Sequence, residues 1–100
     1  MNQFFDELGR RWAAGAHRRG ATIEPPAIDA RIALELLELA RVAAHTRERR
    51  FAPLSCYMAG VAAERLRAVK PGLDDAAVAD YINEIRKELE AETPDASNER

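Results

Sequence analysis

The stretch HTRERRFAPLSCYMAGVAA, residues 45–63, joins a strongly basic segment directly to an apolar one. Pro53 suits the first turn of a helix, because its missing N–H would have no helical partner there. From Leu54 to Ala63 only Ser55 interrupts a run of apolar or small residues. A helix that is apolar on all sides is typical of the centre of a helical protein. We therefore predict that a helix beginning near Pro53 is central to the fold.

Gly60 lies inside this predicted helix, where Gly costs about 1 kcal/mol relative to Ala. Close approach of another backbone would explain a Gly at this position. Lys70-Pro71-Gly72 is a strong stop signal and ends the helix.

Three more helices are predicted around this one. The first is capped by Asn2 and ends near His17, the second runs from Asp29 to about Thr46, and the last begins at Asp74 and Asp75. Each has apolar residues at helical spacing. These are Phe4, Phe5, Leu8, Trp12 and Ala16; Ile32, Ala33, Leu36, Leu37, Leu39, Ala40, Ala43 and Ala44; and Val78, Tyr81, Ile82, Ile85 and Leu89. The prediction is an all-α, compact four-helix array, one domain over residues 1–92, with a frayed polar tail at 93–100.

Leu34 and Val42 lie off the apolar stripe of the second helix, among charged residues. An apolar residue on a solvated face is a place where a partner helix can rest. We expect this face to be the contact surface if the chain forms a homodimer.

Composition excludes several classes of protein. The chain is 47% hydrophobic and 32% charged, which is typical of a folded domain, and its net charge of −2 gives no general attraction to nucleic acid. Residues 41–70 are basic and residues 71–100 acidic, a polarity that opposed helices would neutralise. Cys56 is the sole cysteine, and no segment is long and apolar enough for a membrane. We expect a cytoplasmic protein.

Catalytic and cofactor motifs are missing from the sequence. It contains no Gly-rich phosphate loop and no metal-ligand spacing among His17, His45 and Cys56. His45 beside Ser55 or Cys56 would resemble a base and a nucleophile, but no orienting residue or oxyanion site accompanies them. We expect no enzymatic activity, no cofactor and no metal.

The basic hinge before the third helix suggests an anion site. Arg47, Arg49 and Arg50 would surround the free N–H groups of a helix start, and Ser55 would add a hydroxyl. The same arginines can instead cap carbonyls at the end of the second helix, with Glu48 pairing one of them. Both interpretations remain open at this point.

The run LELARVAAH at residues 37–45, followed by Glu48-Arg49, by Ala52-Pro53-Leu54-Ser55 and by AGVAA at 59–63, resembles a small helical family of unknown function. That family is mostly actinobacterial, and its members occur alone or fused behind a MobA-like molybdenum-cofactor guanylyltransferase domain. The resemblance covers roughly residues 29–89. It implies an association with molybdenum-cofactor maturation, and its motif residues here are His45, Glu48, Arg49, Pro53, Leu54 and Ser55.

The leading hypothesis is therefore a non-enzymatic accessory or protein-interaction module whose partner is a molybdenum-cofactor protein. One alternative is a small anion- or nucleotide-binding domain that uses the basic hinge. The other is a simple homodimer. Nucleic acid is the least expected partner, because the acidic C-terminal third would repel phosphate.

Overall fold

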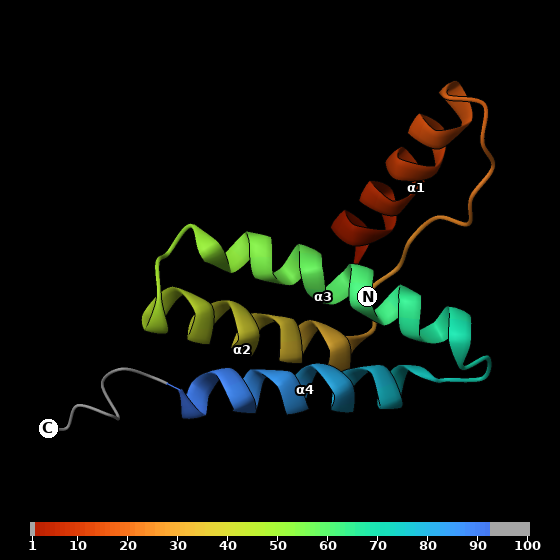
Figure 1. The fold of residues 1–100 in the computed structure, drawn as a ribbon. Coiled ribbons are helices and arrows are strands. Elements are labelled where there is room, and N and C mark those ends of the chain that lie inside the picture. Colours follow the sequence, from red (N-terminus) through yellow and green to blue (C-terminus); the bar gives the residue numbers. More distant parts are fainter. Residues whose placement is uncertain (1, 93–100) are drawn as a thin grey trace, which may run out of the picture. The chain divides into compact units, whose positions relative to one another are not determined.

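The computed structural model describes residues 2–92, which form four α-helices and no strand. The helices are α1 (Gln3–Arg18), α2 (Ala30–Thr46), α3 (Phe51–Val69) and α4 (Asp75–Ala91) (Figure 1). The predicted all-α class with four helices is confirmed. The tail predicted at 93–100 lies outside the described residues.

Local sequence signals set the helix ends. The side chains of Asn2 and Asp74 accept hydrogen bonds from the backbone N–H groups of Phe5 and Ala77, at 3.1 and 2.9 Å. These contacts satisfy donors that a helix start leaves without partners. The third helix begins at Phe51, so Pro53 lies within its first turn as expected and the basic hinge ends at Arg50.

Contacts within the chain group into two units, Met1–Ala30 and Arg31–Arg100. In the first unit, Gly9 is buried in α1, and a Cβ there would collide with the carbonyl oxygen of Pro26. Gly9 thus allows the connector after α1 to lie against the helix. The single domain expected over residues 1–92 stays a prediction.

In the second unit, α2 and α4 run in the same direction and α3 runs opposite to both (Figure 1). Its core is small. The buried apolar residues are Leu39, Val42, Ala43, Ala63, Val78, Ala79 and Ile82, and three of these are alanines.

The central position predicted for α3 is not confirmed. α2 and α4 each contribute three residues to this core, whereas α3 contributes Ala63 alone. The explanation offered for Gly60 is wrong, since no atom of a neighbouring element lies within 4 Å of a Cβ placed there. An apolar composition on every side of α3 therefore does not mean that every side is covered.

The partner surface predicted at Val42 is also wrong. Its side chain is 2% exposed, whereas Leu37, which belongs to the predicted buried stripe, is 67% exposed. Val42 lies on the same side of α2 as Glu35, which contacts α4. Because α4 packs against this side, the buried side of α2 contains Val42 and leaves Leu37 exposed. Leu34 is exposed, as predicted.

Candidate functional site

The outer side of α3 is an apolar surface that the second unit leaves open. Leu54, Tyr57 and Met58 are 60, 73 and 70% exposed, and Val69 is exposed as well. Residues spaced three and four apart along this side form what we call the α3 face, which consists of Phe51, Leu54, Tyr57, Met58, Val61, Arg65, Ala68 and Val69. Single exposed apolar residues are ordinary on a protein surface, but a contiguous stripe of them indicates a binding surface.

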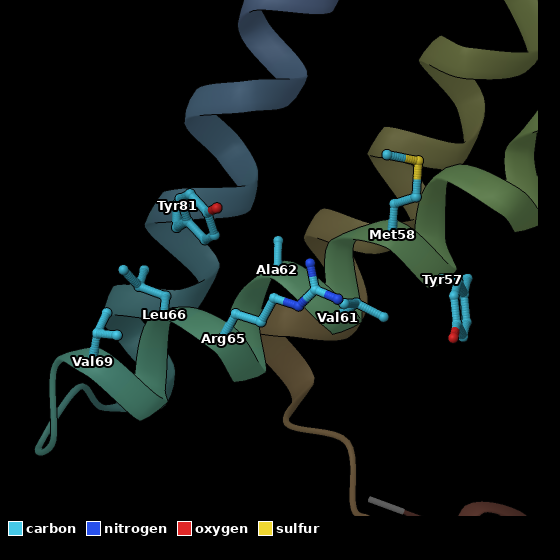
Figure 2. Close-up of a pocket in the computed structure, with 8 residues that line it drawn as sticks. All are labelled: Tyr57, Met58, Val61, Ala62, Arg65, Leu66, Val69 and Tyr81. Carbon is cyan, nitrogen blue, oxygen red and sulfur yellow. The ribbon is translucent and has the colours of Figure 1, made fainter.

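A shallow groove of about 610 Å³ runs along the α3 face toward α4. Figure 2 shows its lining, which is apolar except for the Arg65 guanidinium and the two tyrosine hydroxyls. The lining residues are Tyr57, Met58, Val61, Ala62, Arg65, Leu66, Val69 and Tyr81. The side chain of Arg65 extends along the helix toward Val61, so its aliphatic part covers apolar surface.

A second groove, of about 380 Å³, lies between α3 and α4 and reaches Leu39 of the core. Ile82, Ile85 and Leu89 of α4 form one wall, and Ser55 supplies a hydroxyl. Met58, Ala62 and Tyr81 line both grooves. The two hollows are therefore one continuous apolar surface across α3 and α4, which suits the side chains of another helix better than a polar small molecule.

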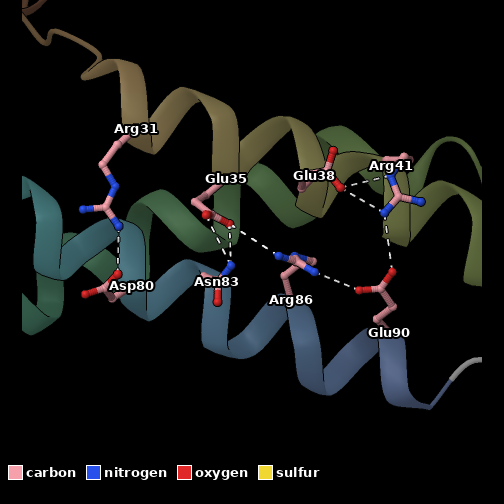
Figure 3. A network of polar contacts seen from close by, with 8 residues as sticks. All are labelled: Arg31, Glu35, Glu38, Arg41, Asp80, Asn83, Arg86 and Glu90. Carbon is pink, nitrogen blue, oxygen red and sulfur yellow. Dashed lines mark hydrogen bonds and ion pairs between the residues drawn. The ribbon is translucent and has the colours of Figure 1, made fainter.

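The contact between α2 and α4 is polar at its edge, unlike the α3 face. Arg31 pairs with Asp80 at 2.9 Å and Arg41 with Glu90 at 3.4 Å, near opposite ends of the two helices (Figure 3). Between them, the Asn83 amide donates to the Glu35 carboxylate at 3.1 Å. Of these contacts, the Arg41–Glu90 pair joins the basic region 41–70 to the acidic region 71–100, as the predicted neutralisation requires.

The hinge arginines have the contacts expected of caps and local ion pairs. Arg47 donates to the carbonyl oxygen of Thr46 at 3.0 Å, at the end of α2. Arg50 pairs with Glu48 at 2.8 Å, and both side chains are largely exposed. The N–H groups of Phe51 and Ala52 donate to the carbonyls of Glu48 and Arg49. Anion binding at this hinge stays a hypothesis, and an anion would compete there with the Glu48 carboxylate for Arg50.

Within residues 2–92, His45 forms no hydrogen bond with Ser55 or Cys56, so these residues do not form a nucleophile–base pair. His45 is exposed at the end of α2, while the Cys56 thiol donates to the carbonyl oxygen of Leu36 at 3.6 Å. Burial raises the pKa of the Cys56 thiol, which disfavours the reactive thiolate. Within residues 2–92, no group of three or more His, Cys, Asp and Glu side chains is arranged to hold a metal ion. The same residues include no helix with the length and apolarity to cross a bilayer.

The motif residues at and after the hinge therefore have different structural roles. Glu48 pairs with Arg50, Pro53 lies in the first turn of α3, and Leu54 belongs to the α3 face. Sequence reasoning missed Tyr57, Met58 and Arg65 as surface residues. The signal was present in the three- and four-residue spacing from Phe51 to Ala68, which is the repeat of a helix-pairing surface.

Comparison with known protein families matches residues 4–97 to a domain of unknown function, DUF6457. The match extends beyond the region of the resemblance noted in the sequence and includes α1. Searches of curated proteins and of solved structures found no match. Because the matched region includes nearly all of the residues, the chain belongs to the DUF6457 family, whose function is not established.

Proposed function

We propose that this protein is a non-catalytic interaction module that binds a protein partner through the α3 face and the adjoining α3–α4 groove. The observation that carries the proposal is the exposure of Leu54, Tyr57 and Met58 on one side of a well-formed helix. Burying a side chain of this size contributes about 1.5–3 kcal/mol. Three such residues on one surface would supply a substantial part of a binding free energy.

The small core of the second unit supports the same conclusion. Among its described residues, the only large apolar side chains that are buried are Leu39, Val42, Val78 and Ile82. A unit of about this size has little stability beyond what its core supplies. Covering the α3 face with a partner would add apolar burial that the chain by itself lacks.

The setting we propose for this interaction is molybdenum-cofactor maturation. It rests on the motif resemblance, centred on residues 44–63, to a family whose members occur fused to MobA-like guanylyltransferases. The motif includes Pro53, Leu54 and Ser55, and the structure has these residues at the start of α3. In this proposal the chain contributes binding and no chemical step.

Affinity purification from a native host tests both parts of the proposal. We expect the wild-type chain to retain a protein of molybdenum-cofactor metabolism, identified by mass spectrometry. Val61→Glu should abolish this retention, because it buries a carboxylate in the apolar contact. Leu34→Glu is the control, since it places the same charge on an exposed apolar residue of α2, outside the α3 face.

The possible results distinguish the proposed binding surface from the proposed role in molybdenum-cofactor maturation. Retention that survives Val61→Glu but is lost with Leu34→Glu would move the contact surface to α2. Repeated recovery of proteins from unrelated pathways, with the same dependence on Val61, would contradict the molybdenum-cofactor setting alone.

A further inference from the structure

We propose that a second copy of this chain occupies the α3 face, with the two α3 helices antiparallel; this rests on the proposal that the α3 face is a protein-binding surface. The face contains an alternating three- and four-residue repeat, which is the spacing of a two-helix seam. The seam consists of Phe51, Leu54, Met58, Val61, Arg65 and Ala68. All of these are exposed or half-buried in the described chain.

The seam is complementary to itself in one antiparallel register. We place a twofold axis perpendicular to the two α3 helices, level with the midpoint between Ala59 and Gly60. This axis brings Phe51 opposite Ala68 of the second copy. The same rotation places Leu54 opposite Arg65 and Met58 opposite Val61 of the second copy, so every seam position is matched. The largest side chain then meets the smallest, as close packing requires. A twofold pairing of this kind also closes on itself, so the dimer and a complex with another protein are alternative states of the same α3 face.

Arg65 decides between antiparallel and parallel pairing. In a parallel pair at the same register the two Arg65 side chains would face each other directly across the seam, and like charges at that distance repel. In the antiparallel pair each Arg65 lies level with a Leu54, so the two arginines are about 16 Å apart along the axis. A single charged residue within such a seam is a known means of selecting one arrangement at some cost in stability.

The residues beside the seam support the same register. Glu64 is exposed on α3, and in the antiparallel pair it lies near Tyr57 of the second copy. The tyrosine hydroxyl can donate to the carboxylate, a charge-assisted hydrogen bond. On the other flank, Ser55 faces Ala62 of the second copy, and both are small enough to let the backbones approach. No like charges meet across this contact.

The oligomeric state tests the proposal first. Sedimentation or light scattering from about 5 µM to about 500 µM should follow a monomer–dimer equilibrium. Val61→Glu should shift this equilibrium to monomer and keep the helical circular dichroism, since Val61 contributes nothing to the buried core. Leu34→Glu, on the exposed side of α2, should dimerise like the wild type. A strictly monomeric wild type, or a dimer broken by Leu34→Glu and not by Val61→Glu, would overturn the proposal.

Disulfide trapping tests the antiparallel register. In a Cys56→Ser background, Met58→Cys and Val61→Cys chains are prepared separately and mixed in a glutathione redox buffer. Random pairing of equal amounts would give about twice as much mixed Met58→Cys/Val61→Cys species as of either self-linked species, and we expect the mixed species to exceed that ratio clearly. Predominant self-linking of Met58→Cys with itself would indicate a parallel pair and overturn the register.

The two proposals can fail separately. A monomeric chain that still loses its identified partner with Val61→Glu, and keeps it with Leu34→Glu, would overturn the dimer and leave the interaction module standing. If Val61→Glu changes neither the oligomeric state in solution nor the retention of the partner protein, both proposals are wrong.

Discussion

The guanidinium of Arg86 on α4 lies 3.8 Å from the carboxylate of Glu35 on α2, and the two side chains are only 15 and 19% exposed. Arg86 also pairs with Glu90 at 2.8 Å, and Asn83 donates to Glu35. Partly buried charges are costly unless they are paired. The pair therefore holds α2 and α4 in one register along their shared polar edge (Figure 3).

Arg86→Met should destabilise the second unit by about 1–3 kcal/mol, because Glu35 loses its cationic partner while remaining largely covered. Methionine keeps most of the apolar stem, so the loss reports on the charge. Denaturant unfolding at pH 7 measures it. The control is Arg50→Met, which removes an exposed pair with Glu48 and should change stability by less than about 0.5 kcal/mol. Equal effects of the two substitutions would show that burial of the Arg86 pair contributes nothing.

Because of Glu90, the free energy of unfolding should decrease as the pH becomes acidic. The hydrogen bond from Arg86, followed by the one from Arg41, lowers the pKa of the Glu90 carboxyl in the folded chain. Its stabilising contribution is therefore complete above the unfolded-state pKa of about 4.3 and is lost as the pH falls through the lower folded-state value. The stability difference between wild type and Glu90→Gln should be constant near neutral pH and vanish in acid. A difference that grows on acidification would contradict this sign.

The Cys56 thiol should react slowly with alkylating reagents. Burial raises its pKa, and its hydrogen bond to the Leu36 carbonyl stabilises the protonated form. At pH 8 we expect alkylation several-fold slower than that of a small free thiol, with full reactivity restored in denaturant. Mass spectrometry of the modified chain measures the rate. Reaction at the free-thiol rate under native conditions would mean that α3 opens readily at this position.

Gly9 and Gly60 should respond to alanine in opposite ways. Gly60→Ala should stabilise α3 by up to about 1 kcal/mol, since open space surrounds the added methyl group and Ala is the better helix former. Gly9→Ala should loosen the connector after α1, because the methyl group would collide with the Pro26 carbonyl. Unfolding of the first variant, and proteolysis of residues 19–29 in the second, measure these effects. Gly15→Ala, whose nearest neighbours are the mobile ends of arginine side chains, is the control for α1.

The basic hinge should bind phosphate groups weakly. Arg47 and Arg50 already contact Thr46 and Glu48, and local carbonyls occupy the first N–H groups of α3. Calorimetry with pyrophosphate or GTP should therefore show no saturable binding at physiological salt. Saturable binding that disappears with Arg49→Ala and Arg50→Ala would instead support the anion-binding alternative.

Local chemistry made the helices predictable. Asn2 and Asp74 cap helices because a short polar side chain at that position reaches an N–H group two or three residues ahead. Gly72 ends the turn after α3 with a positive φ of 95°, a conformation that favours Gly. Each of these signals acts over a few residues, so it can be identified without knowledge of the rest of the chain.

The tertiary arrangement decided which side of each helix is buried. Val42 was expected at the surface and Leu37 in the core, and the structure reverses them, because α4 packs beside Glu35 and not beside Leu37. The apolar α3 was expected at the centre, yet three helices can cover only part of one another. By itself the sequence determined four helices and most of their ends, whereas α3 begins at Phe51 and not at Pro53. The choice of buried faces, and with it the open α3 face, depends on contacts between residues far apart in the chain, which local propensity does not encode.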